Sequence, residues 1–237
     1  LVISLIFIIY TNYQCVKIGS KIETLQIELD QNIEGRMLEG FANLPEITFT
    51  DDTSFFASED YLPKMNQVNL KARKLDNQTH ALTKYRNSFQ KIPDAQKKDT
   101  QKFIFQLMEK TSLKCTNMNK YLQYWMPKIK IAKQQTWLEA GMPHTHNTTI
   151  VLNPGWFDSP RQHTFIHELT HVHQRQKPQD FEELYRKWGF FYYQKGIFTI
   201  KGLEDKFLLS RHNPDGMDLN WVWKTPKGEL FWISAEY

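Results

Sequence analysis

The hydrophobic pattern of this chain changes at Pro127, and the change limits the folds that the chain can adopt. Before Pro127, apolar residues recur at steps of three and four, which is the spacing of amphipathic helices. After it, residues 128–133 alternate lysine with apolar residues, and residues 148–152 form a β-branched run, both typical of strands. We therefore expect an α+β fold in which a helical N-terminal region precedes a domain with a small sheet.

The first ten residues are apolar and uncharged. They are fewer than the roughly 20 residues of a membrane-spanning helix, and could be part of an anchor, the apolar part of a signal peptide, or a buried element. A helical stripe continues from Ile18 to Met37, which favours an anchor followed by a stalk. We expect residues 1–43 to be an apolar anchor plus an amphipathic helix in a membrane-anchored or secreted protein. A virion or an organelle membrane is one possible setting.

Charge is unevenly distributed along the first half of the chain. Residues 23–60 contain ten acidic residues and one basic residue, whereas residues 63–133 contain sixteen Lys or Arg and four Asp or Glu. The lysines are spread around helical faces without a glycine-aromatic nucleic-acid signature, which favours a solvated surface over a nucleic-acid site. The charged helices could also contact partners in a protein assembly.

Residues 44–127 form the second predicted region, which is rich in lysine and helical. Its apolar spacing predicts a helix over 68–89 that ends before Pro93. Asp94 or Asp99 can cap the next helix, and a short helix follows over 118–125. No chemistry is visible in this region.

The third region, residues 128–237, contains a helix that carries two histidines. Ser159 and Pro160 predict its start, as an N-cap followed by proline at the first helical position, and the apolar spacing extends it to about Gln176. A β-branched strand precedes it, and the pattern at residues 221–233 predicts a β-hairpin near the end of the chain.

The motif on this helix is His167-Glu168-Leu169-Thr170-His171. Two histidines four residues apart lie on one helical face, so both imidazoles can bind one tetrahedral Zn²⁺ at about 2.0–2.1 Å. Glu168 can reach a water at that metal as general base and return the proton as general acid. The spacing therefore predicts zinc-assisted hydrolysis.

The run from His167 to Val172 resembles the zinc-binding motif of the zincin metallopeptidases, and the likeness covers residues 128–237. It implies a zinc-dependent peptidase of peptide or protein substrates, with His167 and His171 as metal ligands and Glu168 as catalytic base. It also implies that the strand at 148–152 is an edge strand that binds extended substrate. Lys177 stands where metzincins have a third histidine, which leaves a gluzincin-like or aspzincin-like pattern.

The third metal ligand stays open at this point. Asp215 lies in a compact polar loop and could bind the metal as in aspzincins, although the same residues could form an ordinary turn. Glu236 resembles the start of a gluzincin segment, and a residue beyond the chain end is also possible. We favour Asp215, because Glu236 lies on the predicted outgoing hairpin strand. Arg211 is available to stabilise an oxyanion.

Other polar residues could contribute to the site. His163 lies one turn before His167 and could be a fourth ligand or support one, although an exposed or packing role is simpler. His144 and His146 could line the cleft, whereas His173 points away from the pair. Three tyrosines could donate to a transition state, with core packing the simpler reading: Tyr185, Tyr192 and Tyr193.

A second function class stays open beside the peptidase. The apolar N-terminus and the lysine-rich helices also suit a membrane-associated structural or interaction protein that keeps a zincin-like domain, active or degenerate, as a scaffold. A nucleic-acid binder is a third reading, which nothing but the net charge of +4 favours.

Overall fold

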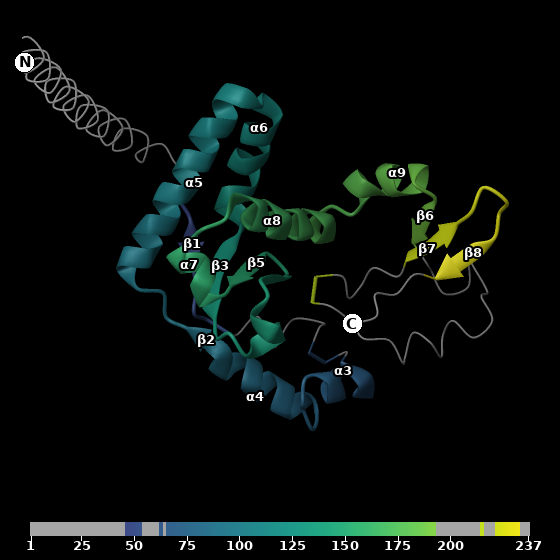
Figure 1. Ribbon diagram of the computed structural model, residues 1–237, viewed down its shortest axis with the longest axis horizontal. Coiled ribbons are helices and arrows are strands. Elements are labelled where there is room, and N and C mark those ends of the chain that lie inside the picture. The colour runs from purple at the N-terminus through teal and green to yellow at the C-terminus, as the bar shows by residue number, and fades with distance from the viewer. Residues whose placement is uncertain (1–45, 54–61, 64, 193–213, 216–220, 233–237) are drawn as a thin grey trace, which may run out of the picture. The chain divides into compact units, whose positions relative to one another are not determined.

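The computed structural model describes residues 46–53, 62–63, 65–192, 214–215 and 221–232 (Figure 1). The chain divides into two compact units, Leu1–Pro45 and Glu46–Tyr237, and the described residues all belong to the second. The predicted anchor and stalk of residues 1–43 therefore lie outside the described residues. None of the helices that the structure describes is long and apolar enough to cross a membrane.

The described residues before Pro127 are mainly helical, as predicted. The helices are α3 (Gln67–Ala72), α4 (Gln78–Ser88), α5 (Asp94–Lys114) and α6 (Thr116–Trp125), followed by the 3₁₀ helix η1 (Met126–Lys128). The prediction of one helix over 68–89 is wrong, because Lys74 adopts a left-handed φ of 55°. Asn77 then caps a new helix by accepting a hydrogen bond from the backbone N–H of His80.

The larger sheet combines strands from both sides of Pro127. Its strands are β1 (Thr48–Phe49), β2 (Phe89–Gln90), β3 (Lys130–Gln134), β4 (His144–His146) and β5 (Thr149–Leu152). The order is β1-β3-β5-β4, with β2 also paired to β3. β3 and β5 are parallel, and β4 pairs antiparallel to β5 with Thr145 opposite Ile150.

This order corrects the expected edge strand. The run at residues 148–152 contains β5, which lies between β3 and β4 and is buried throughout. β4 is the outer neighbour of β5, and no described strand pairs with its other side. The β-branched composition of β5 suits a strand that is buried on both faces. Any substrate strand would therefore have to pair with β4.

The helix α8 (Gln162–Gln176) covers one face of β4 and β5. Phe165, Leu169 and Val172 are fully buried there, and burial of each such side chain contributes about 1.5–3 kcal/mol. Phe103 of α5 extends this core, with its ring 5.5 Å from Trp156 and 6.2 Å from Phe165 between centroids.

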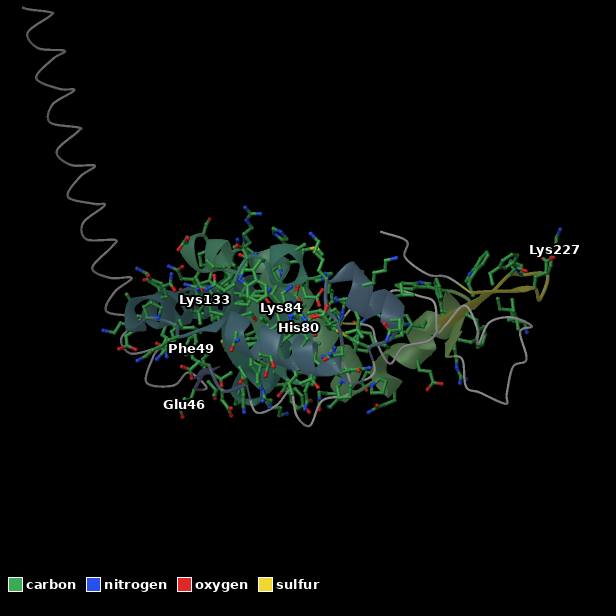
Figure 2. The ribbon with its side chains drawn as sticks, turned by 90° about the horizontal axis from the view of Figure 1, so that it is seen from below. Glu46, Phe49, His80, Lys84, Lys133 and Lys227 are labelled. Carbon is green, nitrogen blue, oxygen red and sulfur yellow. The ribbon has the colours of Figure 1, made fainter. Side chains whose placement is uncertain are left out.

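The helices α3 and α4 pack together with the tight turn η2 (Leu138–Gly141), and α4 reaches the face of β4 that carries His146. The ring of Tyr85 on α4 meets His146 edge to face at 6.3 Å. Lys84, labelled in Figure 2, lies with its Nζ 5.5 Å from the centre of the Trp137 ring. The buried residues of this second cluster are Leu62, Met65, Leu70, Leu75, Ala81, Tyr85 and Leu138.

The predicted start of the motif helix is wrong by two residues. Asn153 caps a short helix, α7 (Pro154–Asp158), which has proline at its first position and ends at Ser159. The chain stays extended at Arg161, and α8 begins at Gln162. The Asn-Pro signal therefore starts a separate helix, and the Ser-Pro pair falls in the connection.

The remaining elements form a smaller antiparallel sheet. The helix α9 (Gln179–Lys187) leads into β6 (Phe190–Tyr192), which pairs with β7 (Trp221–Lys224), and β7 pairs with β8 (Leu230–Trp232). The predicted hairpin at residues 221–233 is thereby confirmed over its described part, with Lys227 at the turn (Figure 2). This mixture of helices and small sheets is consistent with the predicted α+β class.

Candidate functional site

The helix α8 presents the histidine motif on the side that faces away from its core. Phe165, Leu169 and Val172 face the sheet, and helical spacing places His167 and His171 on the opposite side. His167 is exposed and His171 is half-buried. The packing of α8 therefore holds both rings on one accessible face.

The two histidine rings converge. The Nε2 atoms of His167 and His171 lie 3.0 Å apart, with ring centroids at 4.6 Å and planes at 87°. Two nitrogen ligands of one tetrahedral Zn²⁺, each about 2.0–2.1 Å from the metal, lie about 3.3 Å apart. Burial, and then the neighbouring His171, lowers the pKa of His167, which favours the neutral ring that binds metal. The pair therefore fits two positions of a zinc site.

Gln174 contacts the ring of His171, and Tyr185 in turn contacts Gln174. The Nδ1 of His171 lies 2.9 Å from Oε1 of Gln174, and the Nε2 of Gln174 donates to the hydroxyl of Tyr185 on α9. The sequence predicted Tyr185 as a transition-state donor or a core residue, and did not single out Gln174. Its position three residues after His171 is the signal that could have found it.

Glu168 is on the same helix and is almost fully buried. Its side chain is 3% exposed, and its Oε2 has no hydrogen-bond partner among the described residues. Burial, and then the charge of Asp215, raises the pKa of Glu168 to about 8. A carboxyl group with such a pKa can both take and return a proton near neutral pH, and a nearby cation would favour its ionised form.

Asp215 is bound to β4 in this structure. Its Oδ1 accepts hydrogen bonds from the backbone N–H of Thr145 at 2.6 Å and from the Thr145 hydroxyl at 2.8 Å. Arg175 of α8 holds the same segment, because it donates to the carbonyl of Pro214 at 2.9 Å and to the hydroxyl of Thr145 at 3.1 Å. The loop carrying Asp215 is thus fastened to the strand beside the histidine helix.

The structure does not bring the predicted third ligand to the histidine pair. Within the described ranges, no three His, Cys, Asp or Glu side chains are grouped closely enough to hold a metal ion. The charge of Asp215 still acts on the pKa of both His167 and Glu168. Glu236 and Arg211 lie outside the described residues, as does Tyr193.

The other histidines have separate environments. His163 is exposed. His173 packs against aromatic rings of α6 and α9, and its Nε2 lies 2.9 Å from Oδ2 of Asp180. His144 and His146 are buried on the face of β4 opposite Thr145, so they do not join the pair on α8.

A buried ion pair lies near His144 and was not predicted. Arg73 Nε and Glu139 Oε1 are 2.8 Å apart, and the hydroxyl of Tyr85 donates to the same carboxylate. Burial, which outweighs the opposing charge of Glu139, lowers the pKa of His144 to about 4. Glu139 and Arg73 are 66 positions apart, so no local pattern could have connected them.

Comparison of the chain with known protein families, curated proteins and solved structures finds no match. The function must therefore be inferred from the site itself.

Proposed function

We propose that this protein is a zinc-dependent peptidase of the zincin type, acting on peptide or protein substrates. One observation carries the proposal: the Nε2 atoms of His167 and His171 converge to 3.0 Å on the helix that also carries the buried Glu168. This is the residue set that zinc-assisted hydrolysis requires, except for a third ligand.

Each residue of the motif has a distinct role in this proposal. His167 and His171 would hold the zinc ion, with Asp215 as the proposed third ligand. A bound Zn²⁺ supplies Lewis acidity that polarises a carbonyl and lowers the pKa of a water to about 7. Glu168 takes the proton of the attacking water and delivers it to the amide nitrogen as the peptide bond breaks. The pKa of Glu168, raised to about 8 by burial, suits both transfers once a cation lies nearby.

The order of the strands in the larger sheet supports a proposed place for the substrate. An extended peptide would pair with the outer side of β4, where main-chain hydrogen bonds can add a strand. The N–H of Thr145 on that strand is bound to Asp215, so a peptide would have to displace the carboxylate. The carboxylate of Asp215, no longer bound to Thr145, could then bind the zinc ion as its third ligand.

Metal content tests the first part of the proposal. We expect the purified full-length chain to hold about one zinc ion per molecule, measured by mass spectrometry of the metal. His167→Ala and His171→Ala should lose it. His163→Ala is the matched control, because it removes an exposed histidine one turn earlier on the same helix and should keep the metal.

Hydrolysis of a peptide library tests the second part. Glu168→Gln should reduce cleavage by about 10²–10⁴-fold, the usual contribution of general acid–base catalysis, while zinc stays bound. Bound zinc with no Glu168-dependent cleavage would contradict the peptidase and support the alternative, a structural or interaction protein with a zincin-like scaffold. A chain that binds no zinc would contradict both the peptidase and the metal site.

A further inference from the structure

We propose that Gln174 and Tyr185 are positioning residues for His171. Together they keep the proton of its ring on Nδ1, which leaves Nε2 as the metal-binding nitrogen. This inference rests on the proposed zinc site, and it adds two residues that lie outside the five-residue motif.

The first step is the contact between Gln174 and His171. The two residues are three positions apart on α8, a spacing that places side chains next to each other on one helical face. Oε1 of Gln174 lies 2.9 Å from Nδ1 of His171, within hydrogen-bond distance. A carboxamide oxygen can only accept, so in this orientation of the amide the ring hydrogen is on Nδ1.

The second step is the role of Tyr185. The Nε2 of Gln174 donates to its hydroxyl, and in this orientation the amide carbonyl faces His171. Tyr185 is itself held by ring stacking on Phe181 at 5.9 Å, and Phe181 contacts His173 of α8 at 4.7 Å. These aromatic contacts hold α9 against α8 at the place where Tyr185 contacts the amide of Gln174.

The third step is the consequence for the other ring nitrogen. A neutral imidazole with its proton on Nδ1 has its lone pair on Nε2, and this is the atom that lies 3.0 Å from Nε2 of His167. An acceptor at the distant nitrogen also raises the basicity of a metal-binding histidine. Loss of such an acceptor typically costs about 10–100-fold in metal affinity.

The test measures zinc affinity and the position of the ring proton separately. Zinc affinity of the full chain is measured by competition with a chelator. The tautomer of His171 is measured by ¹⁵N chemical shifts of the metal-free protein. Gln174→Leu should weaken zinc binding by about 10–100-fold and convert the ring to a mixture of tautomers.

Two further variants separate positioning from a simple loss of packing. In Gln174→Glu both terminal atoms are oxygens, so either orientation of the side chain presents an acceptor to Nδ1. This variant should retain zinc affinity within about threefold and keep the proton on Nδ1. Tyr185→Phe should produce a smaller loss than Gln174→Leu, with a partly mixed tautomer. Gln176→Leu is the matched control, because Gln176 donates to Asn147 instead.

The outcomes distinguish this inference from the proposed function. Zinc binding that is unchanged in Gln174→Leu, or a wild-type ring with its proton on Nε2, would overturn the positioning role and leave the zinc site intact. Absence of zinc from the wild-type chain would overturn the proposed function and the inference with it. Weaker binding in Gln174→Leu that Gln174→Glu restores would support the positioning role.

Discussion

Glu168 makes a prediction at the scale of a single residue. Burial raises its pKa from the ordinary value of 4.5 to about 8, so the folded state holds a proton that the unfolded chain releases between these pH values. The contribution of Glu168 to the stability of the metal-free protein should therefore fall as pH rises through this window and stay level above it. Glu168→Gln remains neutral, so it should lose this contribution and be more stable than wild type at pH 8 by about 4 kcal/mol, since each pKa unit corresponds to about 1.4 kcal/mol.

Urea unfolding at pH 5 and pH 8, in the presence of a chelator, measures this effect. Glu183→Gln is the control, because the carboxylate of Glu183 is exposed on α9 and should leave the slope unchanged. A slope that persists in Glu168→Gln would show that another group controls the pH dependence.

The buried pair of Arg73 and Glu139 makes a second prediction at this scale. Burial alone would raise the pKa of Glu139, but the hydrogen bond and charge of Arg73 outweigh it and hold the pKa below its ordinary value. Arg73→Met leaves the carboxylate buried without its cation and should destabilise the fold by about 3–5 kcal/mol.

The urea unfolding midpoint measures this loss. Adding Glu139→Gln to Arg73→Met removes the unpaired charge and should recover part of the stability. Lys71→Met is the matched control on the exposed side of α3 and should change the midpoint little. A double variant no more stable than Arg73→Met would rule out the unpaired charge as the cause.

Individual residues of the site differ in how far the sequence predicts them. His167, Glu168 and His171 can be found because helical spacing alone places them, and helix α8 forms as its apolar pattern predicts. The hydrogen bonds of Asp215 to Thr145 connect residues 70 positions apart. Such a contact depends on how the chain returns to the sheet, which no local pattern encodes.

The turn η2 makes a prediction at the scale of an element. Three consecutive residues have left-handed backbones there, with φ of 45° at Glu139, 56° at Ala140 and 73° at Gly141. A Cβ at position 141 would lie 2.8 Å from the carbonyl oxygen of Thr136. Gly141→Ala should therefore destabilise the fold by about 2 kcal/mol or more, from the clash and the disfavoured φ.

Ala140→Gly should have the opposite sign. It relieves a left-handed alanine at a cost of about 1–2 kcal/mol, partly offset by the greater entropy of glycine in the unfolded chain, so a gain of up to about 1 kcal/mol is expected. Thermal unfolding of both variants measures the difference. Equal destabilisation by the two changes would contradict the left-handed turn.

Element boundaries were harder to predict than element types. Asn153-Pro154 and Ser159-Pro160 give the same helix-start signal, and local preference could not show that the first would form its own helix, α7. The β-branched run predicted β5 correctly as a strand. Its place inside the sheet depends on its pairing with β3 and β4, and tertiary contacts determine this pairing.

The division of the chain at Pro45 makes a prediction at the scale of the whole molecule. A protein that begins at Glu46 should keep the cooperative unfolding of the second unit. Its Tm should shift by no more than about 2–4 °C, which corresponds to about 1 kcal/mol in a domain of this size. Differential scanning calorimetry of the two proteins measures this. A larger shift, or loss of the transition, would show that residues 1–45 stabilise the second unit.

The mixture of helix and sheet was predictable because helical spacing fills the chain before Pro127 and strand-like runs appear after it. Assembly of the larger sheet was not, because β1 and β2 come from the helical half and pair with β3 at Lys130–Gln134. The strands of this sheet therefore come from both sides of the predicted boundary at residue 127.

The hydrogen bond between Asp215 and the N–H of Thr145 also has a consequence for solubility. β4 has no neighbour on its outer side among the described strands, and such an edge can pair with the same edge of another molecule. A carboxylate that occupies the outward N–H blocks this pairing and adds a negative charge where a second strand would approach. Asp215→Ala is expected to make the metal-free protein self-associate through β4, which light scattering would detect, whereas a protein that stays monomeric would contradict this protective role.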